Sequence, residues 1–234
     1  MEALVEYMKN LDWSPLVISL KTGIVATIIC FFLGIFAARK VVKANPRVKA
    51  VVDGILTLPM VLPPTVAGFF LLLIFSLRRP FGSFLYESIN FKVVQTWLGC
   101  VLAAMIIAFP LMYRNARAAF EQIDMNLIYA ARTLGMSETQ IFWKVVIPAA
   151  GPGIASGTIL TFARALGEYG ATSMFAGNIP GKTATISQKI AMVIQDGDYV
   201  TAGFWVLVIV LIAFVVVFLL NLITSKHMKN IRRW

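Results

Sequence analysis

The sequence predicts an all-α membrane protein whose single domain, residues 1–234, crosses the bilayer five times. Hydrophobic residues make up 59% of the chain and charged residues only 14%, whereas soluble domains are about half apolar. A bilayer-spanning helix needs roughly 20 apolar residues, and long uncharged runs recur along the chain. We therefore expect membrane spans near 16–38, 50–77, 93–113, 149–174 and 202–224.

The distribution of basic residues predicts the orientation of these spans. Of the 21 Lys and Arg residues, 13 lie in three segments that five spans place on one side, and six lie on the other side. Because Lys and Arg favour cytoplasmic loops, the N-terminus is expected outside the cell and the C-terminus in the cytoplasm. The net charge of +10 is thereby explained without nucleic acid as a partner.

The start of the chain argues against a secretory signal peptide, and its two cysteines argue against a disulfide-rich or zinc-binding protein. Glu2, Glu6 and Asp12 precede the first span, where a secretory signal peptide would be basic. Cys30 and Cys100 both lie within predicted spans, which does not fit a disulfide framework or a zinc site.

Two spans carry sequence features beyond hydrophobicity. The second contains "TLPMVLPPT", with Pro63 and Pro64 after Pro59. Freed backbone carbonyls are tolerated where they face protein or a water-lined cavity, so these prolines could form a structural kink or part of a transport path. In the fourth span, Gly153 and Gly157 are four residues apart, a spacing that favours close packing against another helix.

The longest polar stretch on the cytoplasmic side is residues 114–147. Asp124 can cap a helix, and Gly135 can end it. Ser137 can cap a second helix, with Gln140 three residues later as in a capping box. The pattern predicts a helix, a glycine turn and a second helix outside the bilayer, before Pro148 opens the fourth span.

This segment resembles the EAA signature of ABC-importer permeases. "AARTLG", nine further residues and "VVIP" match the spacing of that signature, with Tyr129 at the position that is often Glu. The resemblance implies a type I ABC importer permease fold in which 114–147 is a coupling segment that contacts an ATPase. The implied coupling residues are Ala130, Ala131, Arg132, Gly135, Met136 and Pro148.

A second motif, "AGNIPGKT" at 176–183, nearly matches a phosphate-binding P-loop. Its first glycine is replaced by Ala176, a membrane helix precedes it, and the topology places it outside the cell. We therefore expect no cofactor in this chain and assign ATP and Mg²⁺ to a partner ATPase.

The region around this motif resembles molybdate permeases. The resemblance rests on "ARALGEYGA", "FAGNIPGKTAT" and the "GDY" before the last span. It implies import of molybdate across a bacterial cytoplasmic membrane by a homodimer of this chain. Two ATPase subunits and an external molybdate-binding protein are the other implied partners, and sulfate or tungstate is the alternative cargo.

Arg164 and Glu168 are the only charged pair deep in a predicted span, and their spacing places them on one helix face. Since a lone charge in lipid is costly, the pair either lines a path or gate, together with Pro63 and Pro64, or locks the span structurally. No catalytic residues are expected for an intramembrane enzyme, because the only histidine, His227, lies in the basic tail. A channel or an ion-coupled transporter would leave the coupling segment unexplained.

Overall fold

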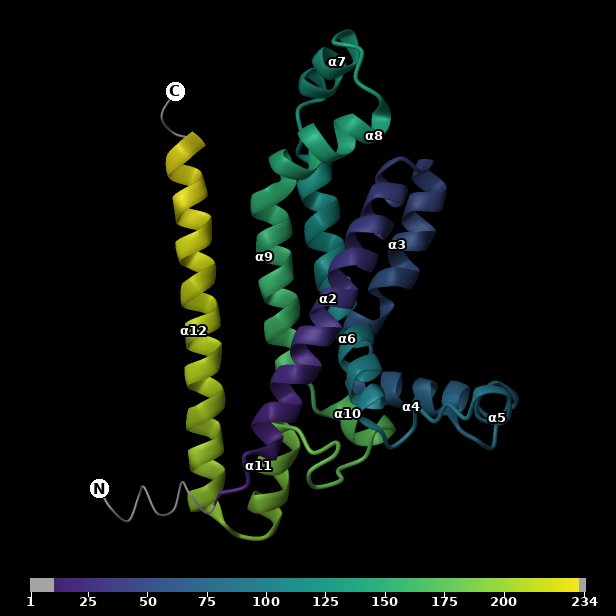
Figure 1. Ribbon diagram of the computed structural model, residues 1–234, viewed down its shortest axis with the longest axis vertical. Helices are drawn as coiled ribbons and strands as arrows, with labels where there is room; N and C mark the ends of the chain where they lie inside the picture. The colour runs from purple at the N-terminus through teal and green to yellow at the C-terminus, as the bar shows by residue number, and fades with distance from the viewer. Residues whose placement is uncertain (1–10, 232–234) are drawn as a thin grey trace.

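The computed structural model describes the backbone of residues 11–231 and the side chains of that range, except those at 220, 221 and 223–231. All regular structure in this part of the chain is helical, which confirms the predicted all-α class. The long helices run side by side along one axis (Figure 1). The helices of the coupling segment lie at the same end of the molecule as the C-terminal end of the last helix, and the start of the first long helix lies at the opposite end.

Three predicted spans are single helices, and each continues past its predicted C-terminal end. Helix α6 begins later than expected because Thr96 caps it, with its hydroxyl accepting a hydrogen bond from the Gly99 N–H at 3.4 Å. It then continues for two turns past Tyr113 into the coupling segment. These helices are α2 (Ser14–Val42), α6 (Trp97–Glu121) and α12 (Tyr199–Ile231).

The second span is not the single helix that 50–77 predicted. It consists of α3 (Pro46–Val61) and α4 (Pro64–Phe75), which are bent by 110° at the break between them. Leu62 and Pro63 have extended conformations, because a residue that precedes proline avoids helical geometry. The expected kink is therefore a complete break, and α4 runs across the long axis of the molecule (Figure 1).

The fourth span also differs from the prediction of one helix over 149–174. Helix α9 (Ile147–Leu166) ends at Gly167, and a separate short helix, α10 (Gly170–Phe175), follows. At its other end α9 is continuous with α8 (Glu138–Ile141) through a π-helical turn at Phe142–Val146. The second cytoplasmic helix was expected to be separate, but the chain stays helical through Pro148, which lies two residues after the π-helical turn.

Two shorter helices occupy the loops at the opposite end from the coupling segment: α5 (Pro80–Ile89) and α11 (Ile186–Gln195). Among the described residues, four helices are long and apolar enough to cross a membrane, and the count is five if the bent α3–α4 pair is one span. The five predicted spans are thus recovered, with the second and the fourth each broken into two helices.

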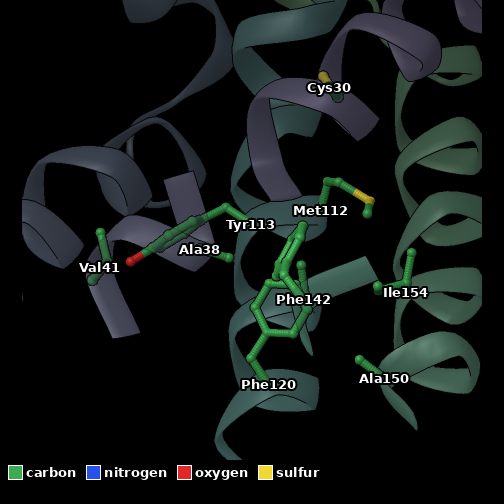
Figure 2. Packing of buried hydrophobic residues seen from close by; sticks show 10 residues of the cluster. Cys30, Ala38, Val41, Met112, Tyr113, Phe120, Phe142, Ala150 and Ile154 are labelled. Atoms are coloured by element: carbon green, nitrogen blue, oxygen red, sulfur yellow. The ribbon is translucent and has the colours of Figure 1, made fainter. Parts of the chain in front are cut away.

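The core nearest the coupling segment joins α2, α6 and α9 to the π-helical turn (Figure 2). Phe120 and Phe142 pack edge to face, with ring centroids 6.0 Å apart. Further along α9, an added Cβ on Gly153 would lie 2.6 Å from the Cβ of Ala119, and one on Gly157 would lie 2.6 Å from the Cβ of Asn115, both on α6. The small-residue spacing therefore packs α9 against α6, as the sequence predicted.

Candidate functional site

The coupling segment has the local structure that its capping residues predicted. Asp124 accepts a hydrogen bond from the Asn126 N–H at 2.9 Å and starts α7 (Met125–Thr133). Gly135 then adopts a φ of +75°, which L-residues rarely adopt. Ser137 and Gln140 form a complete capping box, with hydrogen bonds of 3.3 and 2.9 Å. The two helices are thus joined by a short turn that depends on glycine.

Helix α7 presents two faces. Ala130 is exposed, and the large side chains of Leu127 and Leu134 are 51% and 81% exposed. Ala131 points the other way and is only 4% exposed. Large apolar side chains that gather on one exposed face are typical of a surface that a partner covers. Of the other predicted coupling residues, Arg132, Gly135 and Pro148 are exposed and Met136 is partly buried.

The inner face of α7 packs against α8 and the π-helical turn. A cavity of about 460 Å³ lies between these helices and the end of α6. At its edge, Arg132 Nε donates a 2.8 Å hydrogen bond to Glu138, and Lys43 Nζ lies 3.5 Å from the same carboxylate. The hydrogen bond that Arg132 donates to Glu138 raises the pKa of Arg132 above its ordinary value. These exposed contacts link the ends of α2 and α7 to the start of α8.

The predicted charge pair lies at the far end of α9. Arg164 Nη1 donates to Glu168 Oε2 at 2.7 Å, while Glu168 Oε1 accepts a hydrogen bond from the Ala171 N–H at 2.8 Å. The Glu168 side chain is 2% exposed, and that of Arg164 is 34% exposed. Glu168 therefore ties the end of α9 to the first turn of α10, and only Arg164 keeps accessible surface for an anion.

The two broken spans meet at their short helices. An added Cβ on Gly68 of α4 would lie 2.9 Å from the Ala171 backbone, and one on Gly170 of α10 would lie 3.0 Å from Pro64. Pro64 thus lies beside the start of α10, which begins two residues after Glu168. Of the four residues predicted for a path or gate, Arg164 and Glu168 pair just before α10, and Pro64 lies against the first residue of α10. Their role in a path stays a prediction.

A charged network near the cytoplasmic end of α3 was not predicted. Asp53 accepts hydrogen bonds from both Tyr113 and Arg117 of α6. Glu121, one turn further along α6, accepts a 3.0 Å hydrogen bond from Arg117 Nε and pairs with Lys49 of α3. The i,i+4 spacing of Arg117 and Glu121 was visible in the sequence, but their pairing with α3 is a long-range contact that sequence spacing does not indicate.

The described part of the chain contains no cluster of three His, Cys, Asp or Glu residues that could hold a metal ion. Residues 31–232 match the family of binding-protein-dependent transport system inner membrane components. The chain belongs to this family. It is accordingly a multi-pass permease subunit of an ABC importer, in which ATP hydrolysis belongs to a separate subunit.

Relatives and solved structures agree with this assignment. The permease is 42% identical over 184 residues to the molybdenum transport system permease protein ModB of Escherichia coli, covering 79% of this chain and 80% of ModB. It is 36% identical to a probable sulfate transport system permease protein of Chlorokybus atmophyticus, covering 92% of this chain and 74% of that protein. A chain of the inward-facing MetNI methionine ABC transporter shares the fold, with a TM-score of 0.73, 17% identity and coverage of 94% of this chain and 98% of that one.

Proposed function

We propose that this permease imports molybdate across a bacterial cytoplasmic membrane. The observation that carries the proposal is the 42% identity to a molybdenum permease over most of both chains, against 36% to the sulfate permease. The stretch from Ala163 to Thr183, which resembles molybdate permeases, forms the region around the charge pair and α10. Two copies of the chain, two ATPase subunits carrying ATP and Mg²⁺, and an external molybdate-binding protein would form the transporter.

The geometry suggests how ATP could drive transport. Exposed Leu127, Ala130 and Leu134 offer a small-residue and apolar face on which an ATPase can dock. Because the helix from Glu138 to Leu166 has no break, a displacement of the docked segment tilts α9. The Arg164–Glu168 pair then carries the movement to α10 and, through Gly68, to α4. Such a rigid-body movement of helices is how ligand-driven transporters alternate between two states.

The path needs only weak affinity for its cargo. A tight intramembrane site would retain the anion, whereas conduction requires that binding be weak enough for release. Arg164 offers one partly exposed cation whose charge is balanced by Glu168. This arrangement suits the passage of a dianion, with selective capture left to the external binding protein.

The test is ATP-dependent uptake by the whole complex in proteoliposomes, with molybdate, tungstate and sulfate supplied together with the binding protein. We expect molybdate uptake that excess sulfate does not suppress. Sulfate uptake without molybdate uptake would contradict the assignment and favour the second candidate, sulfate, which the resemblance to the sulfate permease supports.

A further inference from the structure

The positive and negative charges of the network between α3 and α6 balance. It contains two cations, Lys49 and Arg117, and two carboxylates, Asp53 and Glu121, and each carboxylate contacts a cation of the other helix. All four side chains are between 23% and 34% exposed. Ion pairs shielded to this extent hold a geometry better than exposed pairs, which contribute little. The network therefore specifies how α3 sits on α6.

Little else fixes α3 at this end of the molecule. None of its residues is buried, although Val52 and Leu56 touch the core. Further along the helix, a cavity of about 250 Å³ separates α3 from α2 and α6, with Leu56, Pro59 and Phe109 among its walls. A helix bordered by a cavity can shift with little loss of packing. The charged network is thus the main specific attachment of α3 before the break at Pro63.

The far end of the α3–α4 unit is attached differently. Gly68 of α4 packs directly against the backbone of Ala171 in α10. Glu168 ties α10 to Arg164 of α9, and α9 is continuous with the coupling segment. The α3–α4 unit is therefore attached at both ends. The charged network joins α3 to α6, which leads into the start of α7, and α10 joins α4 to α9, which is continuous with the helix that follows α7.

We propose that Asp53 and Arg117 are positioning residues for transport, which make α3 follow the coupling segment. Residues Gln122–Asp124 separate the network from α7, so that a displacement of α7 reaches α6 and α3 directly. A movement of the coupling segment then reaches α3, before the break at Pro63, through this network. It reaches α4, after the break, through α9 and α10. This inference rests on the proposed ATP-driven import, but it concerns transmission and not the identity of the anion.

The test separates ATP hydrolysis from transport. In the reconstituted complex, Asp53→Asn keeps the volume of the side chain and an oxygen for the Tyr113 hydroxyl, but it removes the charge that holds Arg117. Arg117→Gln removes the opposite charge. We expect both variants to hydrolyse ATP within about twofold of the parent, while anion uptake per ATP falls roughly tenfold, the change that 1.4 kcal/mol produces. Arg114→Gln, an exposed change on the same helix, should leave the ratio unchanged.

A cross-link supplies a second test, in which a covalent link replaces the charged attachment between α3 and α6. In a chain with Cys30 and Cys100 replaced, Lys49→Cys and Glu121→Cys can be joined by a short bifunctional thiol reagent. The cross-link should leave uptake intact, because α3 and α6 move together, and it should restore uptake per ATP in Arg117→Gln. A cross-linked complex that hydrolyses ATP without uptake would show that α3 must leave α6 and would overturn the proposal.

The remaining outcomes are also decisive. Unchanged uptake per ATP in both Asp53→Asn and Arg117→Gln would overturn the proposal, and failure of Asp53→Asn to assemble would assign the network to folding instead. The ratio can be measured with whichever anion the parent complex transports. A parent that moves sulfate but not molybdate would therefore defeat the substrate assignment while leaving this test intact.

Discussion

Arg164 and Glu168 lie one helical turn apart, and their 2.7 Å ion pair joins the end of α9 to the first turn of α10. The pair is asymmetric, because the carboxylate is buried while the guanidinium is partly exposed. Both oxygens of Glu168 are engaged, one by Arg164 and one by the Ala171 N–H. Whatever moves α9 must therefore also move α10.

This asymmetry predicts unequal effects of removing the charges. Arg164→Ala strands a buried carboxylate, and breaking a buried pair in this way costs about 3–5 kcal/mol. The double variant Arg164→Ala with Glu168→Gln should be milder, because the amide oxygen can still accept the Ala171 N–H and no charge is stranded. Thermal unfolding of the complex in detergent measures the difference. A double variant that is less stable than Arg164→Ala would contradict this view of the pair.

The turn between α7 and α8 should not tolerate a β-branched residue. At the φ of +75° that Gly135 adopts, valine adds strain of about 1–3 kcal/mol. We expect Gly135→Val to insert into the membrane but to lose most of its copurified ATPase and its uptake. Gly151→Val is the matched control, since Gly151 lies in α9 with open space around its Cα. Equal loss in both variants would mean that the turn geometry is not what matters.

Adjacent alanines on α7 should respond differently to a charge. Ala130→Glu adds a carboxylate to the exposed face and should release the ATPase without lowering the thermal stability of the isolated permease. Ala131→Glu forces a carboxylate into a site that is 4% exposed, where an unpaired charge is costly, and should lower the stability itself. Copurification and thermal unfolding distinguish the two. Stable Ala131→Glu with normal copurification would show that α7 is oriented differently.

The contact between α4 and α10 should be sensitive to a single methyl group. In Gly68→Ala the new Cβ would lie 2.9 Å from the Ala171 backbone, closer than side chains normally approach, so the two short helices must separate. We expect uptake to fall at least about fivefold, by analogy with the 1–3 kcal/mol cost of overpacking. Gly54→Ala, which adds the same methyl in open space on α3, should transport normally. Normal uptake by Gly68→Ala would remove the contact from the transmission route.

The proposed sidedness can be tested with single cysteines in a background lacking Cys30 and Cys100. Glu87 of α5 and Thr139 of α8 are both exposed and lie at opposite ends of the molecule. An impermeant thiol reagent applied to intact cells should label Glu87→Cys and spare Thr139→Cys. Labelling in the reverse pattern would invert the topology.

The sequence could predict those features that depend on neighbours along the chain. Long apolar runs located the spans, and Asp124, Gly135 and Ser137 located the ends of the two cytoplasmic helices, because capping is a local hydrogen-bonding effect. The i,i+4 spacing of Arg164 and Glu168 predicted their contact in the same way.

Features that depend on distant segments were missed. Prolines at 63 and 64 predicted a kink and account locally for the break, but no local pattern indicates that the 110° bend sets α4 against α10. Asp53 was visible only as a charge at the edge of a span, because its partners Tyr113 and Arg117 belong to another helix. The inward position of Ala131 likewise depends on how α7 rests on the rest of the fold.

The most direct test of the account is accumulation of molybdate by proteoliposomes that contain the permease, its ATPase and the external binding protein. The account predicts accumulation above the external concentration only when the ATPase hydrolyses ATP, and none with a non-hydrolysable analogue. Molybdate entry that needs no ATP and stops at equilibrium would identify a channel and contradict the coupling mechanism derived from α7, α9 and the Arg164–Glu168 pair.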